Sequence, residues 1–222
     1  MKIFIIFILF YLVGYLSYKI SYLVHELGHL ISATLVGWNV ISMQVGNYGI
    51  FKREDGWSFE RKYYSLSRTL IISPIEITKN NFFMKFLFVT ISGYLMNIIF
   101  IIFLAVYCIN SSGPIRYIIL VGLIVSIITL IQTLKCEYND KGLSDSLAIK
   151  LLVQKKSRED MLKILLFESE MFKDIKYYED LENEMFFYPE KYKLPEVRDG
   201  LSKEIYYLVE LMSSRSYNLK SK

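Results

Sequence analysis

Residues 3 to about 36 form an almost unbroken apolar run, and this run limits the folds open to the chain more than any other feature. About 20 apolar residues in a helix cross a bilayer, so the run is long enough to span one. Two further apolar runs cover residues 82 to about 108 and 115 to about 134. The chain has 222 residues, of which 53% are hydrophobic, and a mean hydropathy of +0.32, which is too apolar for an ordinary soluble domain. The sequence therefore predicts an α-helical membrane protein with about three transmembrane helices, embedded in a lipid bilayer.

Between the first and second runs, residues 38–73 alternate apolar and polar side chains with interspersed glycines, which favours a small β-hairpin insertion. A hairpin beside the membrane suggests that an extended peptide binds by strand addition along residues 41–53. A plain connecting loop is the alternative. After residue 150 the composition becomes charged while helical periodicity continues. We therefore expect a membrane-embedded core over residues 1–150 and a cytosolic helical tail over residues 151–222.

The basic residues predict the orientation, because Lys and Arg concentrate in short loops on the cytoplasmic side of a membrane. Residues 109–114 contain none, whereas the connection from 38 to 81 contains Lys52, Arg53, Arg61, Lys62, Arg68 and Lys79. This asymmetry predicts a multi-pass protein of the cell (plasma) membrane with its N-terminus outside and its C-terminal tail in the cytoplasm. The net charge of +4 is small and the basic residues are mixed with acidic ones, so we expect no nucleic-acid partner. The sequence specifies no oligomeric state.

The only two histidines stand inside the first apolar run, in the stretch His25-Glu26-Leu27-Gly28-His29. Residues four apart on a helix project from one face, so both rings can offer a nitrogen to one metal ion. Glu26 is then placed to take a proton from a water molecule that zinc activates. The stretch therefore predicts a hydrolytic Zn²⁺ site, and the competing interpretation is two helix histidines that bind no metal. Gly28 costs a helix about 1 kcal/mol relative to alanine, so we expect another backbone to approach it closely.

A third zinc ligand is needed, because catalytic zinc generally has three protein ligands and one position for water. No other histidine exists in the chain, so the remaining candidates are carboxylates. Glu54 and Glu60 follow the first apolar run, while Asp140 and Asp145 follow the third. A membrane setting favours the aspartates, which a helix bundle can bring back to the first run. A simple helix N-terminal cap is the alternative role for Asp145.

Three more residues inside the apolar runs are candidates for a role at the site. Gly93 in the second run favours close packing against the first helix, and Asn97, one turn later, is placed to direct its amide at the metal. A structural hydrogen bond between helices is the alternative for Asn97. Lys19 lies two helical turns before Glu26 on about the same face. It is either a charge that lines the active-site cavity or a lysine that reaches the membrane surface or an internal partner.

These residues together resemble the site-2 protease family of intramembrane zinc metalloproteases. The resemblance lies in the His-Glu-Leu-Gly-His stretch, in Gly93-x-x-x-Asn97 and in an aspartate after a third apolar run, and it covers roughly residues 1–150. It implies that His25, His29 and Asp145 bind zinc, that Glu26 is the general base, and that the substrate is a membrane-embedded peptide or protein. The chain departs from the family in having no proline near the third motif, Ser146 where a glycine is usual, and no PDZ domain.

The sequence therefore predicts an intramembrane zinc endopeptidase, a metalloprotease that hydrolyses peptide bonds within or beside the bilayer. The alternative is a non-catalytic membrane-binding protein derived from the same family, with a degenerate zinc site. A third interpretation is a membrane-tethered zinc protease of the soluble type, in which Glu54 or Glu60 is the third ligand.

Overall fold

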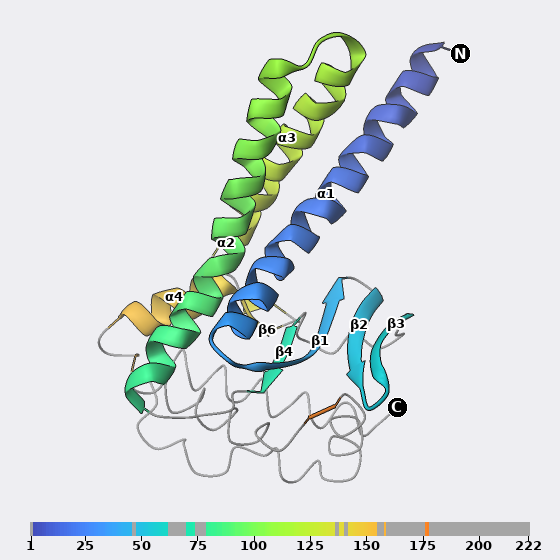
Figure 1. Cartoon of the computed structure of the whole chain (residues 1–222). Helices are drawn as coiled ribbons and strands as arrows, with labels where there is room; N and C mark the ends of the chain where they lie inside the picture. The colour runs from blue at the N-terminus through green and yellow to red at the C-terminus, as the bar shows by residue number, and fades with distance from the viewer. Residues whose placement is uncertain are drawn as a thin grey trace.

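The computed structural model describes residues 2–45, 48–61, 70–73, 79–135, 138–139, 142–154, 158 and 176–177. Its elements are α1 (Lys2–Leu35), β1 (Asn39–Val45), β2 (Tyr48–Arg53), β3 (Gly56–Arg61), β4 (Leu70–Ser73), α2 (Lys79–Asn110), α3 (Gly113–Thr133), β5 (Tyr138–Asn139), β6 (Gly142–Leu143) and α4 (Asp145–Val153). Three long helices run together, and the strands and α4 lie at one end of them (Figure 1).

Three of these helices are long and apolar enough to cross a membrane, over Phe7–Leu35, Phe82–Asn110 and Gly113–Thr133. This confirms the expectation of about three such helices and is compatible with a multi-pass membrane protein. The turn between α2 and α3 is short, so the two helices run antiparallel side by side (Figure 1). Pro114 stands in the first turn of α3, where its missing N–H has no helical partner to lose.

Small and polar side chains join α1 to its neighbours. Ser21 Oγ lies 2.7 Å from Ser126 Oγ on α3, and Ser32 Oγ lies 2.6 Å from Ser92 Oγ on α2. Lipid tails are as apolar as leucine, so helices in a bilayer gain stability from close packing and from hydrogen bonds of this kind. The α1 face that meets α2 and α3 is therefore polar along much of its length.

A four-stranded antiparallel sheet follows α1, in the order β3-β2-β1-β4. Gly37, with φ +81°, ends α1 and turns the chain toward β1, because glycine adopts this left-handed conformation without strain. Trp38 comes next and stacks on Phe82 at the start of α2, with ring centroids 5.7 Å apart. The predicted hairpin over residues 38–73 is thus part of a larger sheet.

The strand order contradicts one sequence-based expectation. Strand β1 is paired on both sides, with β2 and with β4, and β2 is paired with β1 and with β3. Within the described sheet, most of residues 41–53 are therefore paired on both sides and offer no continuous backbone edge for an added strand, so the prediction of strand addition along them is wrong. Alternation of side chains reveals that a segment is extended, but it does not reveal which strands become its neighbours.

The end of the predicted membrane core and the predicted tail are described only in part. The helix that begins at Asp145 is described as far as Val153, so it crosses the predicted boundary at residue 150. Most of the predicted cytosolic tail over residues 151–222 lies outside the described residues, as does Asp140.

Candidate metal centre

His25 and His29 lie on the last turns of α1, at the end of the helices where the sheet and α4 gather (Figure 1). Both residues are buried, with exposed fractions of 3% and 6%. Their Nε2 atoms are 3.2 Å apart, as expected for two imidazoles four residues apart on one helical face. The two ring nitrogens therefore lie on one face of α1, as the spacing predicts.

Asp145, the first residue of α4, completes a cluster with the two histidines. Its Oδ2 atom lies 2.9 Å from His25 Nε2 and 3.0 Å from His29 Nε2. The side chain of Asp145 is 33% exposed, whereas the rings are almost fully enclosed. One oxygen and two nitrogens, all potential metal ligands, thus converge on one point from segments more than a hundred residues apart in the chain.

The two glutamates considered from the sequence do not join this cluster. Glu60 forms an ion pair with Arg53, with 2.5 Å between Oε1 and Nη2. Glu54 is exposed in the turn between β2 and β3. Asp140 lies outside the described residues. Among the carboxylates that the structure describes, Asp145 is the one that contacts both histidines.

Two serines, one on each side of Asp145 in the chain, hold Asp145 in place. Ser144 caps α4 by accepting a hydrogen bond from the backbone N–H of Leu147, and its hydroxyl donates to the Lys135 carbonyl at 3.2 Å. The hydroxyl of Ser146 donates to the Thr133 carbonyl at 3.0 Å. The cap of α4 is therefore Ser144, which excludes the interpretation of Asp145 as the cap.

Tyr94 on α2 strengthens the same junction. Its hydroxyl donates to the Thr133 carbonyl at 3.1 Å and lies 2.7 Å from Ser146 Oγ. Its ring packs edge-on against His25, with centroids 5.3 Å apart. Nothing in the sequence distinguished Tyr94 from the 17 other tyrosines, because its role depends on where α4 lies.

Hydrogen bonds on the far side of each ring set the direction of its Nε2 atom. His29 Nδ1 donates to the Val89 carbonyl at 2.7 Å, so in the neutral ring Nε2 carries a lone pair that faces the cluster. The Asn97 amide nitrogen lies 3.3 Å from His25 Nδ1, and the buried Asn97 Oδ1 has no hydrogen-bond partner among the described residues. Turning this amide over lets Oδ1 accept from Nδ1–H of His25, which leaves a lone pair on His25 Nε2 facing the cluster.

Glycines on both helices make room for the cluster. A Cβ atom at Gly93 would lie 2.5 Å from His29 Nε2 and 2.7 Å from His25 Cε1, which is closer than any real Cβ contact. A Cβ atom at Gly28 would lie 2.5 Å from the Ser92 carbonyl oxygen on α2. The close approach of the two helices that the sequence predicts is therefore present, and Gly93 faces the rings themselves.

The three donor atoms fit a zinc ion. A tetrahedral zinc ion with bonds of about 2.0–2.1 Å has ligands roughly 3.3 Å apart, and the distances here of 2.9, 3.0 and 3.2 Å are slightly shorter. Two imidazoles and one carboxylate, with a fourth position left for water, form a donor set that catalytic zinc uses in proteins. Lone pairs that face one another this closely repel unless a cation or a proton lies among them.

The electrostatics of Asp145 follow from the same contacts. Burial by itself would raise the pKa of Asp145, but hydrogen bonds from His25 and His29, together with the charges of these rings, hold that pKa well below its usual range. The carboxylate is therefore ionised throughout the neutral pH range and needs no deprotonation before it binds a cation. A metal ion that enters must only displace protons from the imidazoles.

Glu26 is buried beside the cluster, with an exposed fraction of 3%. It follows His25 directly in the chain, and its carboxylate is close enough to His29 to interact with it electrostatically. A buried carboxylate next to a candidate metal site is suited to act as a base rather than as a surface charge.

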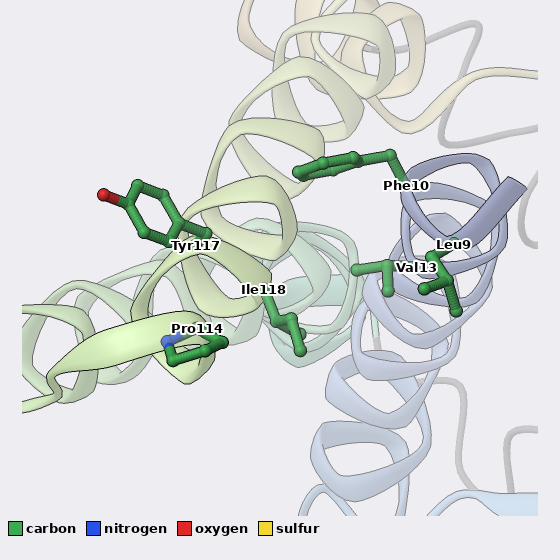
Figure 2. A pocket seen from close by; sticks show the side chains of 6 residues that line it. All are labelled: Leu9, Phe10, Val13, Pro114, Tyr117 and Ile118. Atoms are coloured by element: carbon green, nitrogen blue, oxygen red, sulfur yellow. The ribbon is translucent and has the colours of Figure 1, made fainter. Parts of the chain in front are cut away.

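An apolar pocket lies far from this cluster, at the other end of α1 (Figure 2). It has a volume of about 310 Å³ and is lined by Leu9, Phe10, Val13, Pro114, Tyr117 and Ile118. A rise of about 1.5 Å per residue places Leu9 roughly 24 Å from His25 along the helix. The pocket is therefore separate from the candidate metal centre.

No family model, curated protein or solved structure matches this chain. The resemblance to the site-2 protease family rests on the motifs named above and stays a prediction. The cluster of His25, His29 and Asp145 is an observation of the structure itself, and it stands without any relative.

Proposed function

We propose that the chain is an intramembrane zinc endopeptidase. One observation carries the proposal: His25 and His29 near the end of one apolar helix, and Asp145 just after another, bring three donor atoms within 3.2 Å of one another. Buried ionisable groups beside a membrane span are expensive and usually mark a functional site. Three protein ligands converge among the described residues, which is the number that catalytic zinc takes, whereas a structural zinc site has four.

When bound, zinc would supply a Lewis acid that polarises the scissile carbonyl and lowers the pKa of water. Glu26 takes the proton of the attacking water and delivers a proton to the amide nitrogen as the C–N bond breaks. Val89 and Asn97 hold the imidazoles in the orientation that directs Nε2 at the cluster. Gly93 leaves the space next to the rings free of a side chain.

The proposed substrate is a peptide or protein embedded in the membrane. A helical peptide hides its carbonyls in its own hydrogen bonds, so the segment to be cut must first unwind. Within the described sheet, the outer edges belong to β3 and β4. We propose that an unwound segment adds as a strand to β3 or β4, and not along residues 41–53.

The proposed location is the cell membrane, with the N-terminus of α1 outside and the sheet in the cytoplasm. Support comes from the charges, because Lys52, Arg53 and Arg61 lie in the sheet, whereas the turn between α2 and α3 has no basic residue. In this orientation the cluster lies at the cytoplasmic end of the spans.

Cleavage of single-span reporters tests the proposal. Each reporter is one transmembrane segment between two epitope tags, co-expressed with the full-length chain or with its Glu26→Gln variant. The wild-type chain should cut at least one reporter of the panel, and Glu26→Gln should lower the cleavage rate by about 10³-fold or more because the proton acceptor is lost.

The Glu26→Gln variant should keep its zinc, since glutamine is close in shape and Glu26 is not a proposed ligand. Glu54→Gln is the matched control and should cut at the wild-type rate, because Glu54 is exposed in a turn. Continued cleavage by Glu26→Gln would refute the mechanism. A wild-type chain that binds no zinc and cuts no reporter would favour the non-catalytic membrane-binding protein.

A further inference from the structure

Lys19 lies near the middle of the length of the helix bundle, far from both ends. It stands between Ser17, which faces Gly122 on α3, and Ser21, which pairs with Ser126 on α3. Helix α3 runs over Gly113–Thr133, so this level is about 10 Å or more from each end of α3. An extended lysine side chain reaches roughly 6 Å from its Cα atom. If α3 crosses the bilayer, the Lys19 ammonium does not reach water at either surface.

The side chain of Lys19 is on the α1 face that points away from α2 and α3. Ser17 and Ser21, which contact α3, are each two residues from Lys19, or about 200° around a helix. The neighbouring Tyr15 and Tyr18 are 50% and 42% exposed. This outward side of α1, made of Tyr15, Tyr18 and Lys19, is called the Lys19 flank below.

Within the described residues, no carboxylate pairs with Lys19. Its Nζ atom lies over the rings of Tyr15 and Tyr18, 5.6 and 5.9 Å from their centroids. The described carboxylates all lie at the sheet end of the molecule, in the metal centre or in the β2–β3 hairpin: Glu26, Glu54, Asp55, Glu60 and Asp145. An ammonium in hydrocarbon needs a counter-charge, and two cation–π contacts offset only part of its desolvation.

We propose that the Lys19 flank binds a transmembrane helix of the substrate, and that Lys19 pairs with a carboxylate inside that helix. The inference rests on the proposed function for the identity of the helix as a substrate. Charge complementarity selects the occupant, since a mid-membrane cation is satisfied by a mid-membrane Asp or Glu and not by an apolar segment. Glu26 lies two turns further along α1, on about the same face as Lys19.

The geometry also sets where the substrate is cut. Lys19 is six residues before His25, or about 9 Å along the axis of α1. The paired carboxylate of the substrate should therefore lie about two helical turns from the scissile bond, on its extracellular side. The substrate class is a membrane peptide with one acidic residue in the interior of its span.

Recovery of reporters by the full-length Glu26→Gln chain tests the docking without any cleavage. Each reporter is a Leu/Ala span with one Glu at a successive position, paired with a reporter that has Gln at the same position. At one position along the reporter span, the yield of the co-purified Glu reporter should be about tenfold or more higher than that of its Gln counterpart. Adding Lys19→Met to the Glu26→Gln chain should remove the difference in recovery between Glu and Gln reporters, and adding Lys19→Arg should keep it.

Two further variants control the result. Lys85→Met removes a half-buried lysine from α2 and should leave the preference unchanged. Lys19→Glu should reverse the preference, so that reporters with Lys at the same level are now recovered best. Because Lys19→Met removes an ammonium from the bilayer interior, the variant should be at least as stable to heat as its parent. A fall in reporter recovery is then not explained by unfolding.

Three results would overturn the proposal. Equal recovery of Glu and Gln reporters at every level would show that no carboxylate is recognised. A change in cross-linked dimers on Lys19→Met, with unchanged reporter recovery, would assign the flank to a second copy of the chain. Loss of a bound anionic phospholipid in native mass spectrometry, again with unchanged recovery, would assign Lys19 to a lipid phosphate. If reporters bind through Lys19 but wild-type chain cuts none, the proposed function fails and the docking stands.

Discussion

The two faces of α1 satisfy their polar groups in different ways. On the inner face, Ser21, His29 and Ser32 all find partners on α2 or α3, at distances from 2.6 to 2.7 Å. On the outer face, Lys19 contacts only two tyrosine rings within the described residues. In a bilayer, a polar group without an internal partner must find one on another molecule. The inner face therefore supplies the two histidines of the cluster, and the outer face is where another molecule is expected to bind.

The largest expected effect on the inner face comes from Gly93→Ala. The added Cβ atom would lie 2.5 Å from His29 Nε2, so the rings or the helices must shift, and zinc affinity should fall by about 100-fold or more. Competition with a fluorescent zinc chelator measures this affinity.

Gly122→Ala is the matched control for this substitution. It also places a methyl group against α1, but the nearest atom is the hydroxyl oxygen of Ser17 at 3.3 Å, far from the rings. Zinc affinity in this variant should stay within a few-fold of wild type. Equal loss of zinc in both variants would mean that helix packing in general, and not space beside the imidazoles, controls the site.

A smaller effect is expected from Asn97→Ala. Loss of the amide leaves His25 Nδ1 without its buried partner and frees the ring to rotate, and loss of such a supporting residue typically lowers metal affinity by about 10- to 100-fold. Asn97→Asp should bind zinc more tightly than Asn97→Ala, because a carboxylate again accepts from Nδ1–H. The same chelator competition measures both. Unchanged affinity in Asn97→Ala would show that Asn97 only joins the helices.

The smallest expected effect on zinc belongs to the outer face. Lys19→Met should leave zinc affinity within about twofold of wild type, since Lys19 is about 9 Å from His25 along the helix and faces away from α3. Chelator competition checks this as well. A large loss of zinc in this variant would mean that the two faces of α1 are not independent, and the contrast between them would fail.

The sequence predicted what depends on local periodicity. The lengths of the apolar runs predicted three helices long enough to cross a membrane, and the spacing of His25 and His29 predicted two Nε2 atoms on one face. For the third partner, the residues alone favoured the aspartates over the glutamates, and only the resemblance to the site-2 protease family singled out Asp145, because its contact with His29 joins residues 116 apart in the chain. Only the packing of α4 against the ends of α2 and α3 decides it.

The sheet shows the same limit. Alternation in residues 38–73 revealed extended segments, but the placement of β4 beside β1 depends on a pairing between distant residues. For the same reason the sequence did not reveal that Tyr94, Ser144 and Ser146 act together, since they meet only after the chain has folded.

The zinc content of the purified chain tests the central claim most directly. Elemental analysis by mass spectrometry should find about one zinc ion per wild-type chain and none after Asp145→Ala, because the ion then keeps only two protein ligands. Glu60→Ala, which removes a carboxylate that pairs with Arg53 outside the cluster, should keep its zinc. A wild-type chain without zinc, or an Asp145→Ala variant that binds zinc as well as wild type, would contradict the account.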